Sequence, residues 1–293
     1  MNMRETIRPR RSALFMPASN ARALEKAKSL DADALVFDLE DAVAPQNKAD
    51  ARSRACAAAG EGGYGKRELV IRVNPLSSVW GSEDFAAVAS SGTSALCVPK
   101  VDSPEDVEEI RKALGKSDAP GGLAIWAMIE TPLGVVNAGA IAATARADKY
   151  PIDAFLMGAN DLARITRAAQ TPDRLPMLAW LSGCVVAARA YGLDILDAVY
   201  NNFRDEKGFR RECIQGCALG MDGKTLIHPD QIAPCNDIFS PGDEEVAWGR
   251  KVIAAFDAPE NAGKGVITLE GEMVELLHLE IAKRNVALAG ENG

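Results

Sequence analysis

The sequence predicts a (β/α)8 barrel, the TIM-barrel fold of the α/β class, followed by a C-terminal helical extension. Short strand-like runs alternate with helical stretches along most of the 293 residues, a pattern typical of parallel α/β folds. Eight such units occupy about 230 residues, which suits this barrel. No glycine-rich dinucleotide turn follows the first expected strand, which disfavours a nucleotide-binding sheet. A doubly wound open sheet is the alternative.

The expected strands are eight short runs rich in apolar and β-branched residues. They cover residues 13–17, 34–40, 68–74, 95–100, 123–130, 154–161, 195–200 and 224–228. The clearest helical stretches between them are residues 20–30, 103–114, 131–145 and 210–220. Ser103 stands at the N-cap of the second of these, with acids in the first turn, which is a typical helix start.

The pattern changes after the eighth unit, so we expect two domains. Residues 1–236 would form the catalytic barrel, and residues 237–293 a helix-strand-helix extension. In the extension, a helix starts near Asp243, a short strand lies within residues 263–271, and a last helix covers residues 272–285. A barrel does not need this tail, so we expect it to pack on a neighbouring subunit or on the barrel itself.

Composition excludes several function classes. The chain has 41 acidic and 33 basic residues, a net charge of −8, and this field repels nucleic acid and anionic membranes. No apolar run approaches the about 18 to 20 residues that span a bilayer, and the first residues lack a signal-type apolar core. We therefore expect a cytoplasmic protein. The six cysteines show no Cys-x-x-Cys spacing, so we expect free thiols and no zinc site.

Polar side chains stand where the expected strands end. They are Asp38, Glu40, Asp41, Arg72, Asn74, Lys100, Glu130, Asn160, Asp161 and His228. In a (β/α)8 barrel the carboxyl ends of the strands build one shared active site. The sequence therefore predicts a polar pocket at this end. We expect His228, which precedes a proline, to hold a loop by hydrogen bonds rather than to act as a base.

Several carboxylates in one pocket require a cation, since like charges otherwise raise each other's pKa. Oxygen ligands without a thiolate set favour Mg²⁺, or Mn²⁺. Glu130 and Asp161 end consecutive expected strands, so they are the expected direct ligands. Asp38, Glu40 and Asp41, together with Lys100, are expected to surround the metal, to hold its water molecules and to orient basic partners.

Seven stretches resemble, in the right order, the motifs of citrate lyase β-subunit-like enzymes. They are "RSALFMPASNARALEKA", "DALVFDLEDAVAPQNKADAR", "VIRVNP", "VPKV", "MIETPLGVVNA", "GANDLA" and "GKTLIHPDQI". This group includes malyl-CoA and citramalyl-CoA lyases and lies within the wider superfamily of Mg²⁺-dependent HpcH/HpaI aldolases, which the chain therefore resembles. The resemblance covers nearly the whole chain.

The resemblance implies a Mg²⁺-dependent carbon–carbon lyase that forms a homotrimer or hexamer. Such an enzyme cleaves a 3-hydroxyacyl-CoA, such as malyl-, citramalyl- or citryl-CoA, into an acyl-CoA and an oxoacid. In the reverse direction it condenses these two compounds. The resemblance assigns the metal ion to Glu130 and Asp161. It assigns the carboxylate of the oxoacid (glyoxylate, pyruvate or oxaloacetate) to Arg72, whose planar fork matches a carboxylate.

The resemblance also suggests contacts to coenzyme A. Arg11 is expected to contact the anionic cofactor, and Phe15 and Pro17 to line the path of its pantetheine arm. Two positions depart from the family pattern. Asn160 stands where a glutamate is more common, and Glu275 in "GEMVE" stands where many relatives have an aspartate. That aspartate acts as an acid in a neighbouring subunit's site, a role that would here belong to Glu275.

Two other functions remain open at this stage. The chain could be the β subunit of a citrate lyase complex, which acts on a citryl group carried by an acyl-carrier protein. It could also be a barrel without turnover that binds metabolites. The sequence does not decide which hydroxyacyl-CoA is used, or between lyase, thioesterase and synthase activity.

Overall fold

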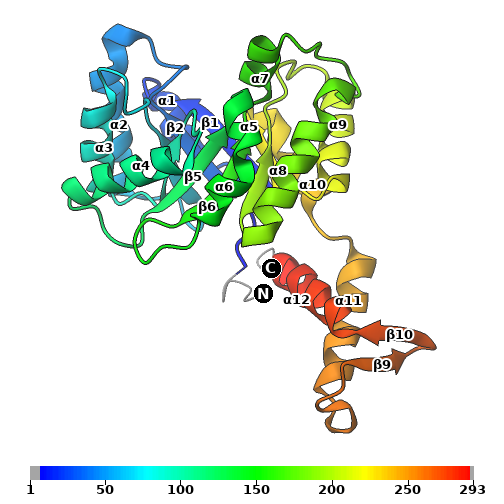
Figure 1. Cartoon of the computed structure of the whole chain (residues 1–293). Coiled ribbons are helices and arrows are strands. Elements are labelled where there is room, and N and C mark those ends of the chain that lie inside the picture. The colour runs from blue at the N-terminus through cyan, green and yellow to red at the C-terminus, as the bar shows by residue number, and fades with distance from the viewer. Residues whose placement is uncertain (1–6, 291–293) are drawn as a thin grey trace. The chain divides into compact units, whose positions relative to one another are not determined.

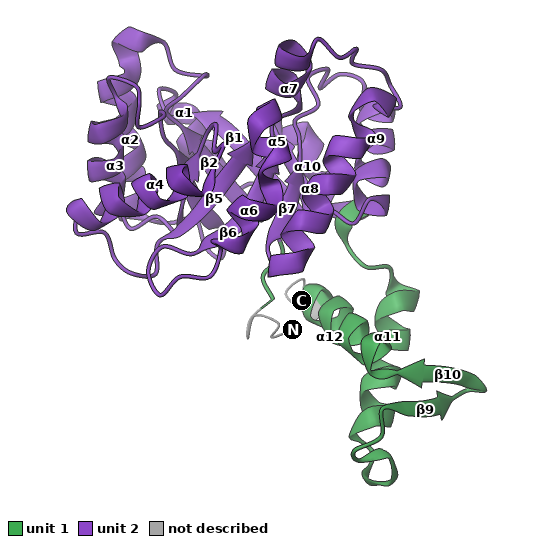
Figure 2. Ribbon diagram, in the orientation of Figure 1, with its two compact units in different colours: residues 1–9, 238–293 green, residues 10–237 purple. Residues whose placement is uncertain are grey.

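The computed structural model describes residues 7–290, which form two compact units. One is residues 10–237, and the other combines residues 7–9 with residues 238–290 (Figure 2). The larger unit is a closed barrel of eight parallel strands (Figure 1), which confirms the predicted fold. The strands are β1 (Ser12–Pro17), β2 (Ala34–Asp38), β3 (Glu68–Arg72), β4 (Ala95–Val98), β5 (Ala124–Ile129), β6 (Ile152–Met157), β7 (Asp194–Asp197) and β8 (Gly223–Leu226).

The barrel strands are apolar because both of their faces are covered. Their interior side chains form one core that includes Val36, Val70, Trp126 and Leu156, and removing such surface from water is the main stabilising term of a fold. The register also positions functional groups. Asp38 is paired with Arg72 across β2 and β3, so the two polar side chains meet at the carboxyl end of the barrel.

The helices surround the strands. In the larger unit they are α1 (Ala21–Ala27), α2 (Lys48–Glu61), α3 (Gly81–Ala89), α4 (Pro104–Lys116), α5 (Pro132–Val136), α6 (Ala138–Ala143), α7 (Ala159–Thr166), α8 (Leu178–Tyr191), α9 (Glu206–Ala218) and α10 (Ile232–Phe239). The Ser103 hydroxyl accepts a hydrogen bond from the Asp106 amide, which confirms the expected cap. The single helix expected over residues 131–145 is wrong, because the chain leaves the helical conformation at Asn137, between α5 and α6.

Several strands end earlier than the sequence suggested, and the reason is local. The Asp38 carboxylate accepts hydrogen bonds from the backbone N–H groups of Glu40 and Ala42, so the chain turns directly after β2. After β6 the chain enters α7, and Asp161 therefore lies on the first turn of a helix rather than on a strand. Residues 38–41 are called the acid turn below.

The smaller unit contains α11 (Asp243–Asp257), β9 (Val266–Leu269), β10 (Glu272–Glu275) and α12 (Leu276–Gly290). The expected helix over residues 272–285 is thus wrong at its start, since residues 272–275 form an antiparallel hairpin with β9. The hairpin packs with both helices through Val252, Ile267, Val274 and Ala282. Assignment of this unit to a neighbouring subunit stays a prediction.

Two expectations about the whole chain concern its cysteines and membranes. All six cysteines are free thiols, as the spacing predicted. Within residues 7–290, none of the helices combines the length and the apolar character that a membrane crossing requires.

Candidate active site

A cavity of about 430 Å³ lies at the carboxyl ends of the strands, where the sequence predicted a pocket. Seven of the expected site residues line it, namely Phe15, Pro17, Asp38, Asp41, Arg72, Glu130 and Asp161. They come from five different strand ends or the turns that follow them. Glu40 and Lys100 do not line the cavity but contact the residues that do.

Arg72 is held rigidly in the cavity wall. Its Nε and Nη2 atoms donate to the two oxygens of Asp38 at 2.7 and 2.6 Å, and its guanidinium lies 5.1 Å from the centre of the Phe15 ring. Burial disfavours the charge, yet the hydrogen bond with Asp38 raises the pKa of Arg72 above its usual range. A guanidinium has five N–H hydrogens. Two of them bind Asp38, and Nη1 faces Glu40 at 2.8 Å, so the second hydrogen of Nη2 is left for a substrate carboxylate.

Glu40 links Arg72 to Lys100. Its Oε2 atom forms an ion pair with Nη1 of Arg72 at 2.8 Å, and its Oε1 atom accepts a hydrogen bond from Nζ of Lys100 at 3.1 Å. Burial raises the pKa of the Glu40 carboxyl, although Arg72 opposes the shift. Oε2 accepts no hydrogen bond with good geometry among the residues described, so one buried oxygen lacks a donor.

Glu130 follows β5 and is buried, with 3% of its surface exposed. Its Oε1 atom accepts a hydrogen bond from the backbone N–H of Lys100 at 2.9 Å, and Lys100 presents this N–H from a left-handed conformation with φ of 54°. Gly158 allows the approach of β6, since a Cβ atom there would lie 2.2 Å from Cβ of Glu130. Burial raises the pKa of Glu130 to about 7, and the charges of Glu40 and Asp161 add to the shift.

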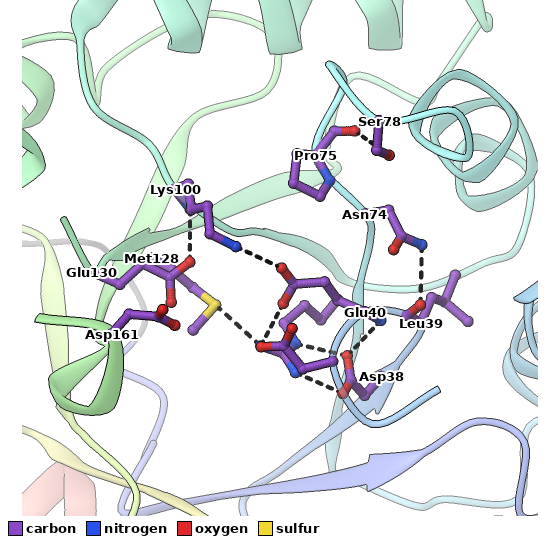
Figure 3. Close-up of polar contacts among 12 residues, drawn as sticks. Asp38, Leu39, Glu40, Asn74, Pro75, Ser78, Lys100, Met128, Glu130 and Asp161 are labelled. Carbon is purple, nitrogen blue, oxygen red and sulfur yellow. Dashed lines mark hydrogen bonds and ion pairs between the residues drawn. The ribbon is translucent and has the colours of Figure 1, made fainter. Parts of the chain in front are cut away.

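Asp161 lies beside Glu130, as Figure 3 shows, while the Lys100 side chain reaches toward Glu40. The Asp161 side chain is 23% exposed, and its Oδ1 atom accepts a hydrogen bond from Arg164, one turn later on α7. Glu130 and Asp161 both line the cavity. The structure therefore brings the two expected ligands to one place.

The donor set fits a hard divalent cation. No three His, Cys, Asp or Glu side chains within residues 7–290 form a complete metal site, but Mg²⁺ commonly uses one or two carboxylates and takes its other ligands from water and substrate oxygens. A cation beside Glu130 would favour the ionised carboxylate, whose burial is otherwise costly. Metal-bound water would also offer a donor to Oε2 of Glu40, so the residues present fit a hydrated Mg²⁺ ion.

Comparison with known proteins shows to which family the chain belongs. The family model of the HpcH/HpaI aldolase/citrate lyase family matches residues 11–229. The chain belongs to this family. A (3S)-malyl-CoA thioesterase of Cereibacter sphaeroides is 44% identical, with 96% of this chain and 95% of that protein covered. The family includes carbon–carbon lyases such as citrate lyase subunit beta of Escherichia coli, which is 36% identical over 92% of this chain and 89% of that protein.

A solved structure supports the same relationship. The protein CitE of Mycobacterium tuberculosis, in complex with magnesium, acetoacetate and coenzyme A, superposes with a TM-score of 0.73. It is 30% identical, and the match covers 96% of this chain and 98% of that one.

One departure from the family pattern now has a structural setting. Asn160 and Asn201 exchange hydrogen bonds between their side-chain amides, at 3.1 and 2.8 Å, and Gln170 donates to Asn160. This neutral pair lines the main cavity and also a second one of about 280 Å³. The wall beside Asp161 is therefore lined by neutral amides at residues 160 and 201.

Arg11 requires a correction. It directly precedes β1 and therefore lies at the amino end of the barrel, opposite the cavity. Its guanidinium is buried and bound by both oxygens of Asp33 at 2.7 and 2.8 Å, because the ends of β1 and β2 carry opposite charges there. Arg11 does not line the cavity. Pro17 and Phe15 do, but Phe15 also packs on Arg72.

The two histidines and Glu275 lie where hydrogen bonds fix the backbone. His228 accepts a hydrogen bond from the Asp230 amide and caps the turn of Pro229–Gln231, as expected of a loop-holding residue. Glu275 is the last residue of β10, and its backbone N–H donates to Nδ1 of His278 at 2.9 Å. The acid role of Glu275 stays a prediction.

Two buried charged groups were missed by the sequence reasoning. Lys48 is buried beneath the acid turn, and Asp197 binds both Arg174 and Lys224 between the barrel and α9. Lys48 could have been found, because it shares the buried face of α2 with alanines at helical spacing. The Asp197 cluster joins segments far apart in the chain and has no such local signal.

Proposed function

We propose that this protein is a Mg²⁺-dependent lyase that cleaves a 3-hydroxyacyl-CoA of the malyl-CoA type into an acyl-CoA and an oxoacid. The observation that carries the proposal is that Arg72, Glu130 and Asp161 line one cavity at the carboxyl end of the barrel. The relatives named (3S)-malyl-CoA thioesterase and citrate lyase subunit beta support this substrate class.

Arg72 is assigned to the carboxylate of the oxoacid portion. Asp38 occupies one edge of the guanidinium and Phe15 covers a face, so the remaining N–H groups are held in a fixed orientation before substrate arrives. Such preorganisation lowers the cost of binding. A fork of this kind also distinguishes a carboxylate from a neutral substituent.

Glu130 and Asp161 are assigned to the metal. When bound there, Mg²⁺ supplies Lewis-acid stabilisation of the negative charge that develops on substrate oxygens. Glu40, which is bonded to Arg72 and Lys100, would accept hydrogen bonds from water molecules bound to this ion. The burial of Glu130 limits competition from bulk water.

Bond cleavage requires a proton to leave the hydroxyl group and another to reach the enolate of the departing acyl-CoA. By resemblance to the family, the second proton is assigned to Glu275, with its site completed by a neighbouring subunit in a trimer or hexamer. Coenzyme A would enter the cavity past Phe15 and Pro17, which line it.

Product analysis with malyl-CoA and Mg²⁺ tests the proposal. A lyase releases glyoxylate and acetyl-CoA, whereas a thioesterase releases malate and free coenzyme A. The 44% identical thioesterase makes the second activity the main alternative. Malate without glyoxylate would contradict lyase activity. A panel with β-methylmalyl-, citramalyl- and citryl-CoA then defines the substrate.

The citrate lyase relative raises a third possibility, a β subunit that works only within a complex. Co-purification with α and acyl-carrier subunits, together with activity only on the carrier-bound citryl group, would favour it. Saturable oxoacid binding without turnover of any CoA ester would instead indicate a barrel that only binds metabolites.

A further inference from the structure

Lys48 is a buried cation that the proposed chemistry does not use. It is the first residue of α2, only 5% of its surface is exposed, and it does not line the cavity. Its ammonium group donates to the backbone oxygens of Leu39 and Glu40, both at 2.9 Å, and to Oδ1 of Asn74 at 2.7 Å. An ammonium group has three hydrogens, so all three are committed to these acceptors.

Helix α2 does not need a lysine at this position for packing. The other residues on its buried face are Ala51, Ala55 and Ala59. Burial lowers the pKa of Lys48, which shows that its charge is held against a desolvation cost. The ring of Trp80 lies 4.9 Å from Nζ and covers the ammonium. The three hydrogen bonds compensate for the cost of burying this charge and tie Lys48 to the groups that it holds.

The group that Lys48 holds is the backbone of the acid turn. The Glu40 carbonyl bonded to Lys48 belongs to the residue whose carboxylate meets Arg72 and Lys100. Leu39 is fixed on its other side as well, since its N–H donates to the Arg72 carbonyl at 2.9 Å. The position of the Glu40 carboxylate is thus set by bonds from beneath the turn.

The hydrogen bonds that hold the acid turn extend to helix α3. Asn74 donates from Nδ2 to the Leu39 carbonyl at 3.0 Å and to Oδ2 of Asp84 at 2.6 Å. Asp84 is fully buried and also accepts from Nε of Arg52 at 2.7 Å. Lys48 therefore belongs to a connected polar network from α3 to the acid turn. Lys48, Asn74 and Asp84 are each hydrogen-bonded within it, and such bonds restrict the motion of the residues that they join.

We propose that Lys48 is a positioning residue that holds the acid turn so that Glu40 and Arg72 keep the arrangement needed to bind the oxoacid carboxylate. The inference rests on the proposed function of Arg72. Lys48 acts through the Leu39 and Glu40 carbonyls and touches neither substrate nor metal ligands.

Lys48 contributes charge as well as geometry. The acid turn carries three carboxylates, Asp38, Glu40 and Asp41, and the cations that face them are Arg72, Lys100 and Lys48. Lys48 alone donates only to neutral acceptors, so its charge is not consumed by one carboxylate. Without it, the turn would have an excess negative charge beside a cavity that must receive an anion.

Three variants separate these contributions. Lys48→Met removes charge and donors, Lys48→Gln keeps a donor without the charge, and Lys48→Arg keeps both. Arg67→Met is the matched control, because Arg67 also donates to backbone carbonyls, those of Leu30 and Tyr64, but near the amino end of β3. The measurements are the dissociation constants of glyoxylate and pyruvate in the presence of Mg²⁺, the dissociation constant of Mg²⁺, and the melting temperature.

The proposal predicts that Lys48→Met weakens oxoacid binding by about 10-fold to 100-fold, the effect typical of groups that orient a ligand-binding residue. Lys48→Gln should fall between Lys48→Met and the wild type, and Lys48→Arg should be the mildest. Mg²⁺ affinity should fall by less than oxoacid affinity in all three, because Glu130 and Asp161 are the proposed metal ligands and Lys48 holds only Glu40, which would bind waters of the ion. Arg67→Met should lower the melting temperature and leave oxoacid affinity unchanged.

Equal oxoacid affinity in Lys48→Gln and the wild type would overturn the proposal, and this comparison holds even if Lys48→Met does not fold. A loss of Mg²⁺ and oxoacid affinity by the same factor in Lys48→Met, together with a lower melting temperature, would also overturn the proposal and leave Lys48 as a purely structural residue. Failure of the proposed function has a different result. In that case the wild type itself binds no oxoacid and cleaves no CoA ester.

Discussion

The two sides of the cavity are built in different ways. On the β2–β4 side, Arg72 is bonded by Asp38, the acid turn is bonded by Lys48, and Glu40 joins Arg72 to Lys100. On the β5–α7 side, Glu130 accepts one backbone hydrogen bond, and Asp161 is bonded by an arginine of its own helix. One side holds its charges in internal pairs, while the other brings two carboxylates together.

This difference indicates which ligand each side receives. A prebuilt guanidinium suits an anionic substrate group, because its orientation is already fixed. Two neighbouring carboxylates, one with a pKa raised to about 7 by burial and by nearby acids, suit a cation that removes their repulsion. Substitutions at Glu130 or Asp161 and at Arg72 disturb one side at a time.

The largest effect is expected on the β5–α7 side, at Glu130 and Asp161. Glu130→Gln and Asp161→Asn should each lower Mg²⁺-dependent turnover by at least about 10⁴-fold, since a bound metal supplies several kcal/mol of transition-state stabilisation. Calorimetry should show that Mg²⁺ binding is lost. The control is Asp237→Asn, which removes an exposed carboxylate paired with Arg210. Unchanged Mg²⁺ affinity in both site variants would refute the ligand assignment.

Glu275→Gln tests the acid that neither side of the cavity supplies. Turnover should fall by about 10²-fold to 10⁴-fold, the usual contribution of a general acid, with little change in affinity for the CoA ester. Glu275→Asp keeps a carboxylate and tests reach alone. Kinetics with malyl-CoA give both values.

A mixing experiment tests whether this acid comes from a neighbouring subunit. Inactive Arg72→Ala and Glu275→Gln proteins are combined under conditions that allow subunit exchange. Some sites would then contain both intact residues, so partial activity should return. Absence of recovery despite demonstrated exchange would mean that Glu275 acts within its own chain or is not catalytic.

On the β2–β4 side, Arg72→Lys keeps the positive charge but loses the planar guanidinium group. Oxoacid binding should weaken by about 100-fold, because an ammonium group cannot bind Asp38 and a substrate carboxylate with the same two-dimensional geometry. Mg²⁺ affinity should be retained, which distinguishes this variant from Glu130→Gln. Wild-type affinity for glyoxylate and pyruvate would exclude Arg72 as the carboxylate-binding residue.

The smallest effect concerns stability without divalent cations. The pKa of Glu130 is about 7 in the folded chain, against 4.5 for an ordinary glutamate. Between these values the folded protein retains a proton that the unfolded chain has lost, so the free energy of unfolding should fall as pH rises from about 4.5 to 7, by about 3 kcal/mol at most. Urea denaturation in a chelator should show this decrease. Glu130→Gln should show a smaller decrease, with the remainder coming from Glu40, whose pKa burial also raises. An equal decrease in the variant would contradict the assignment.

The sequence predicted the barrel well because each strand is a local apolar run followed by polar residues. It also identified seven of the residues that line the cavity, since strand order in a barrel determines which ends meet. It failed for Arg11, which lies at the amino end of β1 and is bound by Asp33, and for residues 272–275, whose hairpin depends on pairing with β9. Lys48 was missed because its role depends on contacts with Leu39 and Asn74.

The most direct test is oxoacid binding to the wild-type protein with and without Mg²⁺. If Arg72 and a cation held by Glu130 and Asp161 bind the oxoacid together, glyoxylate or pyruvate should give a clear calorimetric titration with Mg²⁺. In a chelator the affinity should fall by at least about 10-fold, which corresponds to about 1.4 kcal/mol. Equal oxoacid affinity with and without Mg²⁺ would contradict the account, because Glu130 and Asp161 on the β5–α7 side would then contribute nothing to substrate binding.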